Sequence, residues 1–352
     1  MESDSRKFLI DLLNTNSPSG FEKQATRVYT DYIVHYCDVS VDMLYNSIAV
    51  INPDAEFRIL LDAHIDEIGM QITNIHEDGF LFFRRVGGVD PAVVPGTEVV
   101  ILGGQGEVPG IIGKKPIHLH RAEDFKNQLK IDDLCIDIGV ESRKKAKELV
   151  SVGDYITIKP NAKMLNEHRI VSKALDDKIG VFVLAQVMKQ LSCEKLNIGV
   201  YGVASAQEEV GCKGIKILAN KIKPNYSICL DVGFASDTYY EKEKEVSRFC
   251  LGSGVGVNHS TDTNLDFTRR IKEIAVRNDI MFQPIVPIRP TGGTNTSSIQ
   301  LSNDGVITAL LSIPCRYMHS PVEMCDMRDA ESAIALIKNV VLELNNSITD
   351  SL

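Results

Sequence analysis

Two kinds of hydrophobic pattern divide the chain into parts. Near both ends, apolar residues at helical spacing alternate with short apolar runs of strand length, which is the pattern of an α/β domain. Between about residues 70 and 160 the runs are short and separated by glycines and prolines, with one predicted helix near 142–149. The pattern therefore predicts an α/β domain of residues 1–68 and 164–352, interrupted by a β-rich domain of residues 69–163.

The α/β parts contain several elements that the pattern locates closely. Apolar residues at helical spacing predict helices at 8–13, 22–35, 178–190, 265–277 and 329–344. Continuous apolar runs predict buried strands at 57–64, 200–206, 226–231 and 306–314. In open α/β sheets, ligands bind beyond the carboxyl ends of such strands. The residues that follow these runs are therefore the first candidates for chemistry.

Glu208 and Glu209 follow the valine-rich run at 200–206. Two neighbouring carboxylates at a strand exit repel each other, so a cation must lie beside them or one of them must hold a proton. A metal ligand next to a general base satisfies this requirement. The alternative is a solvated helix N-terminus, where the helix dipole favours acidic residues. The rest of the chain has to decide between these two interpretations.

Other candidate ligands occupy equivalent places. His64 ends the run at 57–64 and is followed by Asp66, whose carboxylate can hold the second nitrogen of the imidazole. Asp231 and His319 also follow apolar runs, and Asp176 precedes a predicted helix. Imidazoles and carboxylates without thiolates suit catalytic zinc, cobalt or manganese. Two metal ions that share one aspartate would use all these ligands.

Composition narrows the function classes. The 352 residues carry a net charge of −9 without a large basic cluster, which argues against nucleic acid as a partner. No apolar segment reaches the length of a membrane span, so no membrane partner is expected. The eight cysteines form no C-x-x-C pair and lie mostly in apolar runs, as buried thiols do in a reducing compartment. We therefore expect a cytoplasmic protein.

Two further motifs have ordinary explanations. His118 and His120 could bind a metal together, but no third ligand lies nearby in sequence, so we interpret them as strand residues. The glycine-rich segment 252–256 resembles a nucleotide-binding loop, but the helix and the downstream acidic residue that such a loop requires are missing. Neither motif predicts a site.

Six motifs occur in order along nearly the whole chain. They resemble the successive signatures of the tetrahedral, or TET-type, aminopeptidases of metallopeptidase family 42, which includes glutamyl and deblocking aminopeptidases. The match in order is far more specific than any one motif. The segments are Ala63–Gly69 (AHIDEIG), Val86–Pro91 (VGGVDP), Ile112–Leu119 (IGKKPIHL), Lys173–Asp177 (KALDD), Glu208–Gly211 (EEVG) and Arg316–Glu323 (RYMHSPVE).

The resemblance implies a mixed-sheet α/β fold of the zinc-peptidase, phosphorylase/hydrolase-like type, with an inserted β-rich dimerisation domain. It also implies two divalent metal ions per chain, zinc or cobalt or else manganese. The implied roles are Asp176 as the bridging ligand, His64 and Asp231 as ligands of one ion, Glu209 and His319 as ligands of the other, Glu208 as the general base and Asp66 as the residue that orients His64.

The implied activity is removal of the N-terminal residue from short peptides. Water bridging the two ions would attack the first peptide carbonyl while Glu208 accepts its proton. Family members assemble from dimers, commonly into hollow tetrahedral dodecamers, so a homo-oligomer is expected.

Three other functions were weighed. A dinuclear deacylase of N-acyl amino acids would use the same centre and stays an alternative. A glycosidase needs no histidine ligands, and this chain has no tryptophan for sugar stacking. A non-catalytic relative is disfavoured because Glu208 is present.

Two positions depart from the family pattern. Asn295 stands where the family usually has aspartate, and Lys178 where it usually has arginine. Because asparagine caps helices as well as aspartate does, we expect Asn295 to be a helix N-cap. A change of substrate specificity is the alternative interpretation.

Overall fold

Runs of aliphatic residues form a central mixed sheet of eight strands within the residues that the structure describes. These are residues 2–104, 106–121, 128–238, 247–288, 290–291 and 293–349 of a computed structural model. In spatial order the strands are β1 (Asp38–Val41), β2 (Ser47–Ile51), β12 (Gly199–Ser205), β3 (Arg58–His64), β13 (Tyr226–Phe234), β16 (Ile307–Cys315), β14 (Val255–Asn258) and β15 (Phe282–Ile285).

The four central strands β12, β3, β13 and β16 run parallel. Strands β2 and β14 pair antiparallel with the outer members of this group, so the sheet is mixed as predicted. In the register of the sheet, Ser205 lies opposite His64, and Cys229 lies opposite Asp62. The carboxyl ends of β12, β3, β13 and β16 therefore form one edge, where candidate site residues from separate segments meet.

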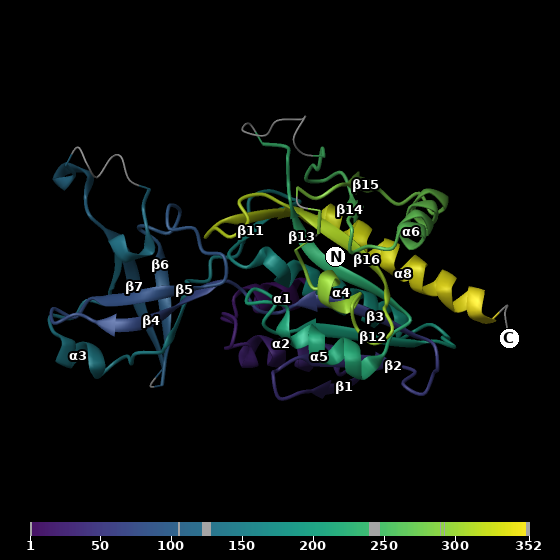
Figure 1. Ribbon diagram of the computed structural model, residues 1–352, viewed down its shortest axis with the longest axis horizontal. Coiled ribbons are helices and arrows are strands. Elements are labelled where there is room, and N and C mark those ends of the chain that lie inside the picture. The colour runs from purple at the N-terminus through teal and green to yellow at the C-terminus, as the bar shows by residue number, and fades with distance from the viewer. Residues whose placement is uncertain are drawn as a thin grey trace.

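Helices cover both faces of the sheet (Figure 1). Neighbouring residues of β3 show this, because Ile59 and Leu61 belong to one buried cluster and Leu60 to another. A strand buried on both faces needs apolar residues throughout, which explains the continuous runs in the sequence. The helices on the first face are α1 (Ser3–Leu13), α2 (Lys23–Ile33), α4 (Leu175–Leu191), α6 (Leu265–Arg277) and α8 (Met327–Thr349), and those on the second are α5 (Lys213–Ile222) and α7 (Thr296–Ile299).

The β-rich segment forms a closed six-stranded barrel, which lies beside the helix-covered sheet in Figure 1. The barrel has its own core, in which Met70, Ile101, Ile136 and Ile156 are fully buried. Helix α3 (Arg143–Lys147) is in the position of the predicted helix. In order around the barrel the strands are β4 (Gly69–Ile75), β5 (Leu81–Val86), β8 (Leu134–Asp137), β7 (Gly106–Lys114), β6 (Glu98–Gly103) and β9 (Tyr155–Ile158).

A small sheet of β10 (Lys163–Met164), β11 (Arg169–Ser172) and β17 (Glu323–Asp326) follows the barrel. Next to it, a buried polar network joins the barrel to the main sheet. The Nζ atom of Lys173 donates to both carboxylate oxygens of Glu67, at 2.6 and 2.7 Å, and to the hydroxyl of Thr157 in β9 at 3.1 Å. Sequence analysis did not single out this network.

Most predicted elements are confirmed, and helix α6 has the predicted bounds. Strand β13 continues three residues beyond Asp231, to Phe234, so Asp231 lies inside the strand and not at its end. The prediction that His118 and His120 are strand residues is wrong, because they lie in and after a 3₁₀ turn at Ile117–Leu119. None of the described helices is long and apolar enough to cross a bilayer.

Candidate metal centre

The five predicted metal ligands lie together at the carboxyl edge of the central sheet. They form two groups, His64 with Asp176 and Asp231, and Asp176 with Glu209 and His319. Within each group the potential ligand atoms all lie within 4.8 Å of one another. Asp176 belongs to both groups, so its carboxylate lies between the two places where a cation could bind.

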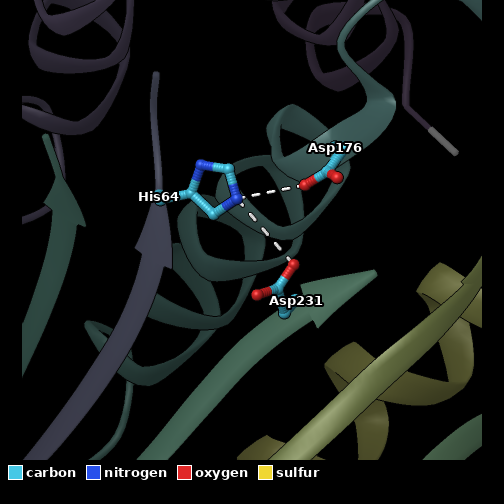
Figure 2. A group of neighbouring side chains, drawn as sticks. All are labelled: His64, Asp176 and Asp231. Carbon is cyan, nitrogen blue, oxygen red and sulfur yellow. Dashed lines mark hydrogen bonds and ion pairs between the residues drawn. The ribbon is translucent and has the colours of Figure 1, made fainter. Parts of the chain in front are cut away.

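The first group is built from three elements that the fold brings together (Figure 2). His64 is the last residue of β3, and Asp231 lies on the adjacent β13. Asp176 is at the start of α4, where its dihedral angles and those of Asp177 are not helical, in agreement with the predicted loop. The Nε2 atom of His64 is 3.1 Å from Oδ1 of Asp176 and 3.8 Å from Oδ1 of Asp231.

The second group depends on the segment that connects β16 and β17. The Nε2 atom of His319 is 3.1 Å from Oδ2 of Asp176 and 3.3 Å from Oε1 of Glu209. His319 has a left-handed backbone conformation with φ of 60°, which is uncommon outside glycine and asparagine. Its backbone N–H donates to Oε1 of Glu323 at 2.8 Å, and Oε2 of Glu323 accepts from the backbone N–H of Asp176 at 2.9 Å.

Glu323 therefore holds the backbone of two candidate ligands at once. Glu323 ends the last of the six sequence motifs, but the sequence predicts no role for it. Nothing in the local pattern around Glu323 could have shown this, because Asp176 lies 147 positions away in the chain. Only the pairing of β17 with β11 brings the Glu323 side chain to the start of α4.

Backbone carbonyls set the orientation of both imidazoles. The Nδ1 atom of His64 is 3.1 Å from the carbonyl oxygen of Asp66, and that of His319 is 3.1 Å from the carbonyl oxygen of Gly88. A Cβ atom at residue 88 would lie 2.5 Å from Nδ1 of His319, so this close approach requires glycine. A carbonyl can only accept, so each Nδ1 carries the hydrogen and each Nε2 is left to bind a cation.

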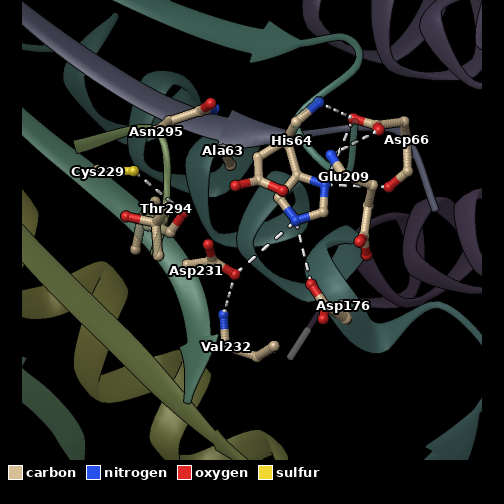
Figure 3. A network of polar contacts seen from close by, with 12 residues as sticks. Ala63, His64, Asp66, Asp176, Glu209, Cys229, Asp231, Val232, Thr294 and Asn295 are labelled. Atoms are coloured by element: carbon tan, nitrogen blue, oxygen red, sulfur yellow. Dashed lines mark hydrogen bonds and ion pairs between the residues drawn. The ribbon is translucent and has the colours of Figure 1, made fainter. Parts of the chain in front are cut away.

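The carboxylate of Asp66 has a second task that was not predicted. It lies 3.5 Å from Nδ1 of His64, farther than the carbonyl of the same residue. Its oxygens accept from the backbone N–H groups of Glu208 and Glu209, at 3.0 and 3.2 Å, and from the hydroxyl of Ser19 at 2.5 Å. Figure 3 shows the Asp66 carboxylate beside His64 and Glu209. Asp66 therefore positions the turn that carries both glutamates, as well as His64.

Glu208 lines the same cavity as the five candidate ligands, and this cavity has a volume of about 650 Å³. Burial, opposed by the charge of His64 and assisted by the negative charge of Glu209, raises the pKa of Glu208 to about 7. A carboxylate with a pKa near neutrality is well matched to proton transfer at neutral pH.

The donor set fits divalent cations. Burial raises the pKa of Asp231 and that of Glu209. Burial lowers the pKa of His319, but its hydrogen bonds to Asp176 and Glu209 outweigh burial and raise it to about 11. Where the structure describes the chain, no lysine or arginine pairs with these carboxylates, and Oε1 of Glu209 faces Nε2 of His319 at 3.3 Å. The raised pKa values mean that these side chains bind protons tightly when no cation is present. Divalent cations would balance the same negative charge in place of the protons.

The prediction that the Asn295 side chain caps a helix is wrong. Asn295 precedes α7, but its side chain makes no capping hydrogen bond. Its Nδ2 instead donates to Oδ2 of Asp62 at 2.7 Å and to the hydroxyl of Ser205 at 2.9 Å. Lys178, the other departure, is buried and donates to the carbonyl of Thr15 at 2.5 Å. The hydrogen bonds of both side chains thus go to residues other than the five candidate ligands.

We expect Asn295→Asp to destabilise the fold, because it would place a second buried carboxylate against Asp62. The loss should be about 1–3 kcal/mol at neutral pH, the cost of an unsatisfied buried polar group. Burial already raises the pKa of Asp62 to about 6, against hydrogen bonds from Ser205 and Asn295. A carboxyl group with a raised native pKa resists ionisation in the folded state, so the fold loses stability as pH rises and the group must ionise. The stability lost in Asn295→Asp should therefore grow from pH 5 to pH 8.

Urea unfolding of this variant at both pH values would measure the effect. A double variant that exchanges the two residues, Asp62→Asn with Asn295→Asp, keeps one hydrogen-bond donor and one acceptor. It should recover most of the lost stability. Equal stability of Asn295→Asp and the wild type at pH 8 would contradict this account of the pair.

The sequence and the fold of this chain match those of known proteins. The sequence profile of the M42 glutamyl aminopeptidase family matches residues 46–336. A lysyl aminopeptidase of Pyrococcus furiosus is 34% identical over 337 residues, which cover 95% of each chain. A TET aminopeptidase from a marine sediment archaeon of the Thaumarchaeota superposes with a TM-score of 0.91 at 29% identity, over 96% of this chain and 95% of the other. The TET1 peptidase of Pyrococcus horikoshii superposes with a TM-score of 0.86 at 33% identity, over 96% and 99%. The chain therefore belongs to the M42 family of aminopeptidases.

Proposed function

We propose that this protein is a dinuclear metal-dependent aminopeptidase that removes the N-terminal residue from short peptides. One observation carries the proposal: two groups of nitrogen and oxygen ligands share Asp176 and line one cavity with Glu208. A shared carboxylate between two ligand groups is the arrangement of two-metal hydrolases. Membership of the M42 family supports hydrolysis of peptides as the reaction.

The roles of the ligands follow from the two groups. His64 and Asp231 would hold one divalent ion, Glu209 and His319 the other, and Asp176 both. Imidazole and carboxylate ligands without thiolate are compatible with zinc, cobalt or manganese. When bound, such ions supply Lewis acidity, which lowers the pKa of water and polarises a peptide carbonyl.

Glu208 is the residue proposed to move protons. Its carboxylate would accept a proton from the attacking water and then donate it to the nitrogen of the leaving peptide. A pKa of about 7 allows the same group to perform both transfers at neutral pH. Asp66 would keep Glu208 in place through the backbone hydrogen bond at 3.0 Å. An acidic side chain of the cavity would hold the free α-ammonium group of the N-terminal residue.

The surface of the inserted domain, residues 69–163, is the basis of a proposal on how the chains assemble. The barrel presents exposed apolar side chains that include Phe80, Phe82, Ile117 and Leu119. Such residues are enriched where proteins associate. The structural relative from Pyrococcus horikoshii can form a tetrahedron or a large octahedral shell. We therefore propose that the inserted domain of residues 69–163 forms a dimer, which is the unit of a larger homo-oligomer such as a dodecamer.

All eight cysteines are free in the structure. Free thiols persist in reducing compartments. This supports the proposal that the protein works in the cytoplasm.

A direct test is the release of free amino acids from unblocked dipeptides by the metal-free protein, before and after addition of zinc, cobalt or manganese. Cleavage restored by a metal would support the proposal. N-acyl amino acids in the same experiment would identify the alternative, a deacylase. Cleavage of these substrates alone would reject the aminopeptidase assignment.

Metal content should distinguish the shared ligand from the others. Asp176→Ala removes a ligand from both groups and should leave almost no bound metal. His319→Ala removes a ligand from one group only and should leave about one ion per chain, since the group around His64 stays complete. Elemental analysis after dialysis measures both. Equal metal content in the two variants would show that Asp176 is not shared.

A further inference from the structure

The cavity at the metal centre extends well beyond the candidate ligands. Its lining divides into two parts, one made of the six charged or metal-binding residues and the other made of uncharged residues. The uncharged part includes Phe234, Phe249, Ile285, Val286 and Leu310. A cavity with reactive groups at one end and an apolar wall at the other suits a substrate whose scissile bond and side chain occupy different ends.

From this wall we infer that the enzyme prefers N-terminal residues with uncharged apolar side chains, such as leucine, methionine and phenylalanine, over acidic or basic ones. The inference rests on the proposed function and names the substrate class of the same site. The matching family is described as glutamyl aminopeptidase and one relative is named lysyl aminopeptidase. The family alone therefore leaves the preference of this chain open.

The apolar wall is held in a fixed position. Phe249 is buried, and its ring packs against two glycines, one on β13 and one on β14, the strands on either side of β16. A Cβ atom at Gly233 would lie 2.9 Å from the ring, and one at Gly256 would lie 2.8 Å from it. Because the ring fits only where both side chains are absent, Phe249 is closely packed into the sheet. A preformed apolar surface binds an apolar group without paying for its own ordering.

The polar groups of the wall bond to one another. The side-chain amide of Asn258 donates to the carbonyl of Leu310 at 3.2 Å and to the hydroxyl of Ser312 at 2.9 Å. The hydroxyl of Thr294 donates to that of Thr296 at 3.0 Å. These donors are therefore already used. The carboxylate of an N-terminal glutamate would find few partners here and would lose hydration without replacement.

The charge distribution of the described cavity lining also argues against substrates with ionic side chains. Apart from the metal centre and Glu208, the lining residues that the structure describes carry no charged side chain. Among the described lining residues, a lysine side chain in this part of the cavity would find no carboxylate beside it, and a glutamate no cation. Burying an unpaired charge is costly, whereas an apolar side chain gains free energy as it leaves water.

The mouth of the cavity is apolar as well. Phe234 is 66% exposed, Val286 is 61% exposed and Ile288 is 65% exposed, and all three line the cavity. Exposed apolar side chains around a cavity mark a surface that a ligand covers. Since these residues line the same cavity as the metal centre, we assign them to the side chain of the residue being removed.

The test compares kcat/KM of the metal-loaded enzyme on aminoacyl p-nitroanilides of leucine, methionine, phenylalanine, alanine, glutamate and lysine. We expect leucine to exceed alanine by at least about 10-fold, since each buried methylene contributes about 10-fold or more. Leucine should exceed glutamate and lysine by about 100-fold. Faster cleavage of the glutamate or lysine substrate would overturn this inference and leave the aminopeptidase assignment intact. No cleavage of any substrate would overturn both.

Variants of Val286 provide a second readout. Its side chain is exposed and lines the cavity, so a substitution should not disturb the core. Val286→Lys should raise the ratio of glutamate to leucine cleavage by about 10-fold, and Val286→Glu the ratio of lysine to leucine cleavage, because an opposite charge then lies beside the substrate side chain. Val286→Gln controls for polarity and size and should raise neither ratio. Unchanged ratios in both charged variants would overturn the inference.

Binding can be measured without turnover. In metal-loaded Glu208→Gln, calorimetry with Leu-Gly, Glu-Gly and Lys-Gly should give the lowest Kd for Leu-Gly. Equal or tighter binding of either charged dipeptide would also overturn the inference.

Discussion

Glu208→Gln should lower kcat by about 10²–10⁴-fold, the usual contribution of a general base, while metal content stays unchanged. Glutamine keeps the size of the side chain but cannot accept the proton of the attacking water. Glu208 belongs to neither ligand group, so the ions should stay bound. Kinetics with a dipeptide substrate and elemental analysis of the same sample would check both parts.

The neighbouring residue offers a matched control. Glu209→Gln is the same substitution one position along the chain, but Glu209 belongs to the group with Asp176 and His319. This variant should lose metal as well as activity. If Glu208→Gln retained full activity, or if it lost metal as Glu209→Gln is expected to do, the assignment of Glu208 as the base would be wrong.

Lys173→Met should destabilise the fold by about 3–5 kcal/mol, the typical cost of leaving one partner of a buried ion pair alone. Lys173 and Glu67 are each about 2% exposed. Without Lys173, the nearest remaining cation is Lys178, whose Nζ is 3.6 Å from Oε1 of Glu67. Chemical unfolding at pH 7 measures the loss. The double variant Lys173→Met with Glu67→Gln removes the stranded charge and should be more stable than the single variant.

The same pair predicts a pH dependence. Burial raises the pKa of Glu67, but the charges of Lys173 and Lys178 outweigh burial and lower it. A carboxyl group whose native pKa is depressed contributes stability above its unfolded pKa, about 4.3 for glutamate, and loses it as pH falls through the native value. The stability difference between wild type and Glu67→Gln should therefore shrink as the solution is acidified below about pH 4. A constant difference from pH 7 to pH 3 would contradict the charged state of Glu67.

Local pattern was sufficient wherever an element carries its own signals. Helix α6 is amphipathic and begins after Asn264, whose side chain accepts a hydrogen bond from the backbone N–H of Phe267 at 2.9 Å, so its bounds were predictable. The central strands were equally clear, because burial on both faces requires continuous apolar runs. Asp231 shows the limit of this signal. An acidic residue ends the apolar run and therefore predicts the end of the strand, but β13 continues past Asp231 to Phe234.

The candidate ligands could also be named from the sequence. Each was quoted in a motif or followed an apolar run, and the fold of an α/β sheet brings the carboxyl ends of parallel strands to one edge. The histidines at 118 and 120 lacked this context, and the described residues place neither in a metal-binding group. Many histidines bind no metal, and many strands are followed by residues without a role. A histidine directly after a buried strand combines both features and is therefore a better candidate ligand.

The order of strands, helices and chemically reactive residues was thus determined by the sequence itself, because short-range periodicity and motif spacing encode it. Tertiary structure alone decided how those residues are held. The carbonyl of Gly88 orients an imidazole 231 positions away, and Asn295 bonds to Asp62 across 233 positions. Such contacts depend on which strands become neighbours, and no local pattern of hydrophobic and polar residues specifies that pairing.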